Sequence, residues 1–279
     1  MYNKELRLTR AVIPLSLKEP EQKIVSMAGL LRYFGIQQVF LVHVRTNNDK
    51  GKKQERLTDT IRAYALKLRE LGFTVDMYFR RGHIASEILT LAAELEADFL
   101  SVLWERKWAL QKALLGSVEA DIVRMADHPV FVYKHPVFMA REQKINQVMY
   151  TTNFQITDSH VMPYLTNPDF VAQNLYILHV GQRAPDPLAE AERREMARQN
   201  LNRLKAACEH AFQEVSTQDV VGQPKARILH AARRYGVDLL IIGKSDNKSA
   251  FEQIIGSTTQ LIADKAACSV FIVPGEQRR

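Results

Sequence analysis

The chain has 279 residues, 46% of them hydrophobic, and a formal net charge of +7. Its apolar runs fall far short of the about 18 residues that a membrane span needs, and its first ten residues are polar and charged, so we expect a soluble, cytoplasmic protein with no membrane span. Lys and Arg are spread along the chain without interleaved aromatic residues or a binding motif, which argues against nucleic acid as a partner.

The first half of the chain alternates between two kinds of pattern. Near-continuous runs of Val, Ile, Leu and Phe are typical of strands buried on both faces, and the segments between them have the apolar spacing of amphipathic helices. Gly35 and Gly72 close the first two helical segments as C-terminal stops. The predicted strands are 10–15, 38–44, 73–79, 98–104 and 129–134, and the predicted helices are 19–35, 56–72, 84–96 and 117–127.

The second half follows the same order of elements. Pro163 and Pro168 interrupt the segment 156–173, so its first helix is the weakest of the predicted elements. The predicted strands of this half are 146–152, 174–180, 212–220, 237–243 and 268–274.

Comparison of the chain with itself shows that it contains two copies of one unit. Gly82 and Gly116 are separated by the same 34 residues as Gly222 and Gly256, with similar apolar patterns around them. A strand–helix alternation of this kind forms a doubly wound α/β domain with a parallel sheet covered on both faces. We therefore expect two tandem α/β domains, residues 1–140 and 141–279, each with a five-stranded parallel sheet.

The fourth strand of the second unit ends at Gly243, where ligands of doubly wound sheets usually bind. The letters Gly243-Lys244-Ser245 look like the end of a phosphate-binding P-loop. The P-loop motif needs a second glycine five residues before the glycine of Gly-Lys-Ser. In this chain that position is Asp238, so the P-loop interpretation fails.

The spacing of Gly243, Asp246 and Gly256-Ser257 resembles another motif, the Gly-x2-Gly-x9-Gly-Ser/Thr of universal stress proteins. The resemblance covers nearly the whole chain twice, so the chain looks like a tandem universal stress protein. It implies that the motif follows the fourth strand and holds the phosphates of ATP. It also implies that the two domains pair through their last strands as an intramolecular pseudo-dimer, and two chains are expected to associate further.

Residue by residue, the resemblance predicts an adenine-nucleotide site, for ATP or AMP, in the second domain only. Glycines let backbone N–H groups approach an anion, and the start of a helix adds hydroxyls and the positive end of its dipole. Asn153 stands at the family's first-strand Asp position, and Val180 at its adenine-side position. The candidate binding residues are Asn153, Val180, Gly243, Lys244, Ser245, Asp246, Gly256, Ser257, Thr258 and Thr259.

Asp246 replaces the second glycine of the motif. A carboxylate about 5 Å from a phosphate oxygen would cost on the order of 3 kcal/mol at an effective dielectric near 20. A helix terminus contributes only about 0.3 to 2 kcal/mol, so the repulsion can exceed it unless Lys244, Lys248 or a metal ion offsets it.

The first unit has lost more of the motif. Leu103 and Arg106 occupy its glycine positions, and Ser16 occupies the first-strand position. Leu103 carries a Cβ where close backbone approach is needed, and Trp104 and Trp108 are expected to fill the loop. Gly116-Ser117 is therefore interpreted as a turn and helix cap.

No other constellation points to chemistry. Cys208 and Cys268 have no CxxC spacing and are expected to be buried or semi-buried free thiols. The histidines show no metal-ligand spacing, and His43 and His179 occupy equivalent strand ends, which favours a structural role. No base and orienting acid can be named for Ser257 as a nucleophile.

The leading hypothesis is therefore a non-enzymatic, stress-related regulatory or ligand-binding protein. A nucleotide switch through the second domain is the first alternative. A slow ATPase, or a pocket repurposed for a partner or an apolar ligand, remains open as well.

Overall fold

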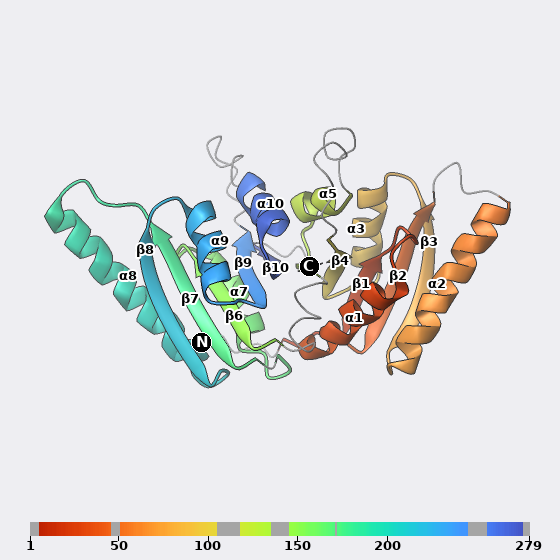
Figure 1. Ribbon diagram of the computed structural model, residues 1–279, viewed down its shortest axis with the longest axis horizontal. Coiled ribbons are helices and arrows are strands. Elements are labelled where there is room, and N and C mark those ends of the chain that lie inside the picture. Colours follow the sequence, from red (N-terminus) through yellow and green to blue (C-terminus); the bar gives the residue numbers. More distant parts are fainter. Residues whose placement is uncertain are drawn as a thin grey trace.

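The computed structural model (Figure 1) describes residues 6–45, 51–104, 118–134, 145–170, 172–244 and 256–275. Within these residues the strands form one ten-stranded sheet in the order β3-β2-β1-β4-β5-β10-β9-β6-β7-β8. All neighbouring strands are parallel except β5 and β10 at the centre, which are antiparallel. Each half of the sheet is thus a five-stranded parallel sheet, as the sequence predicts.

The first repeat runs from β1 to β5. Its left-handed Gly35 (φ 83°) and Gly72 (φ 87°) follow the first two helical segments, as predicted. The helix predicted from residue 56 begins four residues earlier, at Lys52. The elements are β1 (Arg10–Pro14), α1 (Glu21–Leu31), the 3₁₀ turn η1 (Arg32–Phe34), β2 (Gln38–Arg45), α2 (Lys52–Glu70), β3 (Thr74–Arg81), α3 (Ile84–Glu94), β4 (Phe99–Leu103), α5 (Val118–Met125) and β5 (Val130–Tyr133).

The second repeat runs from β6 to β10. Its weakest predicted helix forms as α7, in spite of Pro163, because the proline lies in the last turn and removes only one helical hydrogen bond there. The elements are β6 (Gln147–Thr152), α7 (Thr157–Leu165), β7 (Asn174–Gly181), α8 (Pro187–Cys208), β8 (Glu214–Val221), α9 (Pro224–Arg234), β9 (Leu239–Lys244), α10 (Gly256–Lys265) and β10 (Ser269–Pro274).

Alternate residues of each strand enter two hydrophobic clusters, because successive side chains of a strand point to opposite faces. Phe271 belongs to one cluster and Val270 and Ile272 to the other. The first cluster packs against α1, α2, α7 and α8, and the second against α3, α5, α9 and α10. Both clusters draw residues from both repeats, so the two halves share their core.

The two repeats meet through their last strands. Phe131 of β5 lies opposite Phe271 of β10 in the antiparallel register. On one face of this junction Phe34 stacks on Phe170 at a ring distance of 5.2 Å and packs against Phe271 at 5.4 Å. The predicted intramolecular pseudo-dimer is therefore confirmed, and aromatic residues from both repeats cover its central strands.

Equivalent aspartates fasten the first strand of each repeat. The Asp98 carboxylate accepts hydrogen bonds from the N–H groups of Thr9 at 2.7 Å and Arg10 at 2.8 Å. The Asp238 carboxylate accepts two at 2.9 Å from Gln147 and its preceding residue. Asp98 lies 16 residues after Gly82, and Asp238 lies 16 residues after Gly222, so these equivalent positions have the same structural task.

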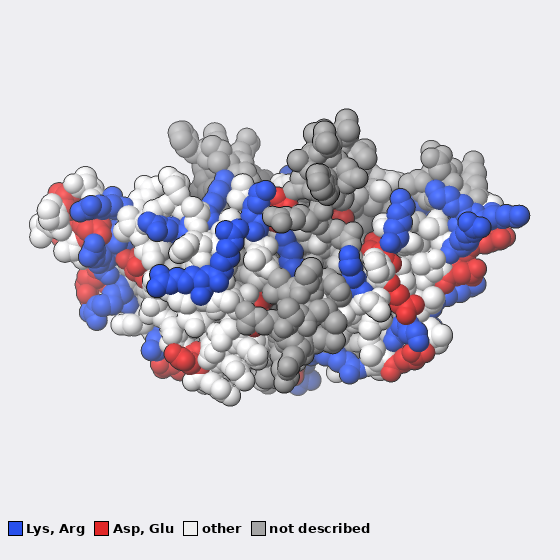
Figure 2. All heavy atoms as spheres, in the orientation of Figure 1, with Lys and Arg blue, Asp and Glu red and all other residues white. Residues whose placement is uncertain are grey.

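Charged side chains of both signs lie interspersed over α2 and α8 at the two ends of the molecule (Figure 2). Such interspersed charges are typical of a solvated surface. Of the helices that the structure describes, none has the length and apolar character needed to cross a membrane.

Candidate functional site

Each repeat has a point where the strand order reverses. In the first repeat it lies between β1 and β4, and in the second between β6 and β9. In doubly wound sheets, ligands bind outside the carboxyl ends of the strands at such a point.

In the second repeat, Thr157 at the start of α7 contacts both strand ends at this point. Its buried hydroxyl lies 3.4 Å from Asn153 Oδ1. A Cβ atom added to Gly243 would lie 2.9 Å from Thr157 Cβ, closer than side chains approach. The structure therefore brings Asn153 and Gly243 together around one residue, and it gives Gly243 a packing task besides any role in binding.

The loop after the first strand has the same form in both repeats. Asn153 Oδ1 accepts a hydrogen bond from Gln155 N at 3.2 Å, and Ser16 Oγ accepts one at 3.3 Å from the N–H group two residues on. In each loop the residue between the donor and the acceptor has a left-handed backbone: Phe154 (φ 59°) in the second repeat and Leu17 (φ 62°) in the first. The side-chain oxygen of Asn153 already accepts a hydrogen bond within the loop. The group that Asn153 can offer a ligand is therefore its amide NH₂, a hydrogen-bond donor.

Lys244 extends into the other repeat. Its ammonium group donates to the carbonyl oxygens of Arg124 at 2.9 Å and Ala126 at 3.1 Å, at the C-terminal end of α5. The sequence suggested that this lysine could offset the charge of Asp246, a residue that lies outside the described part of the chain. In the structure the lysine ammonium group lies at a helix end in the first repeat.

The remaining predicted residues are placed only in part. The helix α10 begins at Gly256, as the motif requires, and Thr259 in its first turn is buried. Val180 is half-buried and packs against the second hydrophobic cluster. Ser245 and Asp246 lie outside the described residues, as do the side chains of Ser257 and Thr258.

The equivalent histidines fasten strand ends. His43 Nδ1 donates to the carbonyl oxygen of Leu15 at 2.9 Å, and His179 Nδ1 donates to that of Thr152 at 3.0 Å. Each bond joins the second strand of a repeat to the end of its first strand. This matches the structural role that their equivalent positions indicated.

Sequence reasoning missed a buried polar cluster beside Asn153. The Asp158 carboxylate accepts hydrogen bonds from the Tyr150 hydroxyl at 2.5 Å and from the Thr152 hydroxyl at 2.8 Å. Burial raises the pKa of Asp158 and, more strongly, that of Tyr150. The only signal in the sequence was a difference between the repeats: the first repeat has apolar Ile13 and Leu15 at the positions of Tyr150 and Thr152.

An ion-pair network lies beside the last residue of β7. The Arg193 guanidinium group contacts Glu190 at 3.0 Å and Asp219 at 2.9 Å. The hydrogen bonds from Arg193 are the main reason that the pKa of Glu190 lies well below its usual range. A Cβ atom on Gly181 would lie 2.9 Å from this guanidinium group, so the glycine leaves the room for it. The network brings α8 together with β7 and β8 through residues that are separated in the sequence, so no local sequence pattern predicted it.

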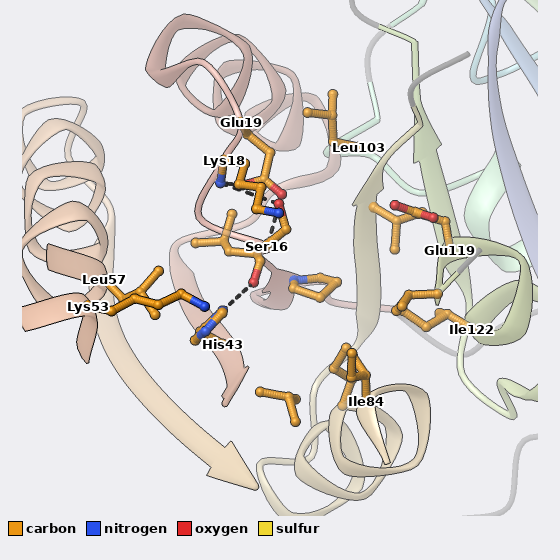
Figure 3. A pocket seen from close by; sticks show the side chains of 16 residues that line it. Ser16, Lys18, Glu19, His43, Lys53, Leu57, Ile84, Leu103, Glu119 and Ile122 are labelled. Atoms are coloured by element: carbon orange, nitrogen blue, oxygen red, sulfur yellow. Dashed lines mark hydrogen bonds between the residues drawn. The ribbon is translucent and has the colours of Figure 1, made fainter. Parts of the chain in front are cut away.

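The first repeat has a cavity of about 540 Å³ at its own switch point (Figure 3). Leu103, which aligns with Gly243, forms part of its wall. The Trp104 ring centre lies 5.4 Å from the Lys134 ammonium group, and Trp104 is not among the lining residues. The loop that Trp104 and Trp108 were expected to fill lies outside the described residues. Arg106 and Gly116-Ser117 lie outside the described residues.

No group of three or more His, Cys, Asp or Glu side chains in the described part of the chain could hold a metal ion. The arrangement offers backbone groups, an amide donor and a helix start. Groups of these kinds are suited to an anionic ligand.

Comparison with known proteins identifies relatives of both repeats. The model of the Universal stress protein family matches residues 38–134 and 171–274. The Universal stress protein YxiE of Bacillus subtilis (strain 168) is 27% identical over 115 residues, which cover 36% of this chain and 78% of that protein.

Two solved structures match nearly the full length. A universal stress protein from Archaeoglobus fulgidus DSM 4304 has a TM-score of 0.73 at 19% identity, covering 95% of this chain and 96% of the other. A protein of unknown function from Pseudomonas aeruginosa PAO1 has a TM-score of 0.71 at 14% identity, covering 96% and 92%. At these identities the likeness shows the fold, and it extends across both repeats.

Proposed function

Because the chain belongs to the universal stress protein family, we propose that it is a non-enzymatic, stress-related regulatory protein whose second repeat binds an adenine nucleotide, ATP or AMP. One observation carries the proposal. Asn153 and Gly243, from strands that are distant in sequence, both contact Thr157 at the switch point of the second repeat. The residues aligned with the family's nucleotide motif thus share one end of the sheet.

The chemistry of this end suits a phosphate-bearing ligand. The helix α10 begins at Gly256, and the N–H groups of a helix start attract anions. The amide of Asn153 can donate to a ligand oxygen. Asp246 is the residue that opposes this proposal, and the affinity for ATP depends on where its carboxylate points.

Binding without turnover is proposed because the buried acid next to Thr157 in the sequence already accepts hydrogen bonds within the protein. Asp158 follows Thr157 directly, but its carboxylate accepts hydrogen bonds from Tyr150 and Thr152 and is buried. A general base must reach the proton that it abstracts, and this carboxylate faces its own hydroxyl partners. Phosphate release from ATP that exceeds that of a Ser257→Ala variant would support the slow ATPase instead.

We also propose a cytoplasmic location, a division into domains 1–140 and 141–279, and association of two chains. The central strands β5 and β10 are paired within the chain, so a second chain would have to use another surface. Light scattering on the purified chain measures this association directly.

Calorimetry with ATP plus Mg²⁺ and with AMP tests the nucleotide proposal. We expect saturable binding that Asn153→Ala weakens by about tenfold, the value of one good hydrogen bond to a ligand. Ser16→Ala, the equivalent change in the first repeat, is the matched control and should leave the affinity unchanged. Absence of heat at millimolar nucleotide, or equal effects of the two variants, would overturn the proposal.

A further inference from the structure

The cavity of the first repeat lies at the carboxyl ends of β1, β2 and β4 (Figure 3). Its volume of about 540 Å³ falls within the range of about 300 to 1,000 Å³ that is usual for sites of small organic molecules. Its position at a switch point is where such ligands bind in this fold.

The cavity is mainly apolar. Branched aliphatic side chains reach it from β4, α3 and α5, among them Leu103, Ile84 and Ile122. Leu103 takes the place of Gly243 of the second repeat, and its side chain forms wall where a glycine would let backbone amides approach a phosphate. The cavity is therefore shaped for an apolar group rather than for a polyphosphate chain.

The backbone amides beside the cavity are also occupied. The Glu19 carboxylate accepts hydrogen bonds from Ser16 N at 2.8 Å and from Lys18 N at 3.1 Å. Between these residues Leu17 is left-handed, which turns neighbouring N–H groups toward a common point, as in an anion-binding concavity. The protein fills that concavity with its own carboxylate, so a ligand phosphate cannot use it.

Four charged side chains line the remaining space, Lys18, Glu19, Lys53 and Glu119, and the Glu19 carboxylate already accepts hydrogen bonds from backbone amides. Figure 3 shows the Lys53 side chain reaching from α2 toward His43 on one side, with Glu119 and Ile122 on the opposite side. An anionic group would be attracted to the Lys53 side and repelled from the Glu119 side. The cavity thus has a cationic side next to an apolar interior.

From these observations we propose that the first repeat binds a small amphipathic acid, with its anionic group at Lys53 and its apolar body against Ile84, Leu103 and Ile122. This site is independent of the nucleotide proposed for the second repeat. The two repeats would then bind ligands of different chemistry at equivalent places.

The test uses the full chain and the fluorescent aromatic sulfonate 8-anilinonaphthalene-1-sulfonate, displaced by octanoate. We expect saturable fluorescence that octanoate reverses and octylamine, its cationic counterpart, does not. Lys53→Gln should weaken octanoate by about fivefold, which is the usual upper value for a solvent-exposed ion pair. Lys52→Gln, on the same helix turn but outside the cavity lining, is the matched control and should change nothing.

A second variant tests the apolar part. Ile84→Trp fills the cavity from a half-exposed position at the start of α3 and should abolish displacement by octanoate. Leu66→Trp, at an exposed position of α2, is its control. Equal binding of octanoate and octylamine, equal affinity in the Lys53 and Lys52 variants, or displacement by ATP as effective as by octanoate would each overturn the proposal. Because nucleotide binding is measured with Asn153→Ala, either proposal can fail alone.

Discussion

The Lys244 ammonium group lies 2.9 Å from the carbonyl oxygen of Arg124, a residue of the other repeat. Lys134 makes the reciprocal contact, with its ammonium group 3.2 Å from the carbonyl oxygen of Asp264 in the last turn of α10. Arg124 and Asp264 occupy equivalent positions in the two repeats. Because helix C-termini carry partial negative charge, a lysine of each repeat stabilises a helix end in the other repeat, and each of these helices borders a proposed ligand site.

Replacing Lys244 with Met should therefore affect stability more than binding. We expect a loss of about 1 kcal/mol in the free energy of unfolding, because the carbonyl groups at the end of α5 lose a charged donor. Nucleotide affinity should stay within twofold. Urea denaturation and calorimetry measure the two quantities, with Lys205→Met as a control because its ion pair is long, at 3.9 Å, and half-exposed. A loss of nucleotide binding without a loss of stability would contradict this assignment.

Gly243→Ala should destabilise the protein by about 1 to 3 kcal/mol, because the new methyl group would lie 2.9 Å from Thr157 Cβ. Thr157→Gly removes the opposing atoms, so the double variant should be more stable than the sum of the single changes predicts. Urea denaturation of the four proteins gives this coupling energy. Strict additivity would show that α7 does not pack on Gly243 in solution.

Asp246→Gly restores the motif glycine and should tighten ATP binding by at least tenfold, because it removes a carboxylate from the phosphate loop. Arg106→Gly makes the equivalent change in the first repeat and is the control, measured by the same calorimetry. Unchanged affinity in the Asp246 variant would show that this carboxylate does not face the phosphates.

The buried Asp158 should make stability depend on pH. Its pKa is raised in the folded state, chiefly by burial, so the folded protein holds this proton more tightly than the unfolded chain does. The contribution of Asp158 is then greatest near and below its ordinary pKa of 3.8 and is lost as the pH rises through the folded value.

Urea denaturation from pH 4 to pH 7 measures this loss. The free energy of unfolding of the protein minus that of an Asp158→Asn variant should fall as the pH rises, because the amide does not ionise. Ser159→Ala, the exposed neighbouring position, should show a difference that does not vary with pH. A difference for Asp158→Asn that grows with pH would reverse our interpretation.

The thiols of Cys208 and Cys268 should be unreactive in the native protein. Both are buried, and burial raises the pKa of each to about 12, so almost no thiolate exists at pH 8. Ellman's reagent should label neither thiol in buffer and two per chain in guanidinium chloride. Rapid labelling of the native protein would indicate local opening of α8 or of the loop before β10.

The sequence alone determined the architecture. Near-continuous apolar strands, glycines at helix ends and the equal spacing of Gly82–Gly116 and Gly222–Gly256 predicted two doubly wound repeats, because these signals record local conformation and burial. The resemblance carried by Gly243 and Gly256-Ser257 added the pairing of the last strands, which the register of Phe131 and Phe271 confirms.

Only the tertiary structure decided what the strand-end side chains do. It placed the Lys244 ammonium group on a helix 120 residues away and Thr157 against Gly243, and it gave the first repeat an apolar cavity walled by Leu103. It also enclosed Asp158 with Tyr150. Periodicity shows which face of an element is buried. It does not show which distant residue meets the end of a strand, because packing between elements that are far apart in the chain decides that contact.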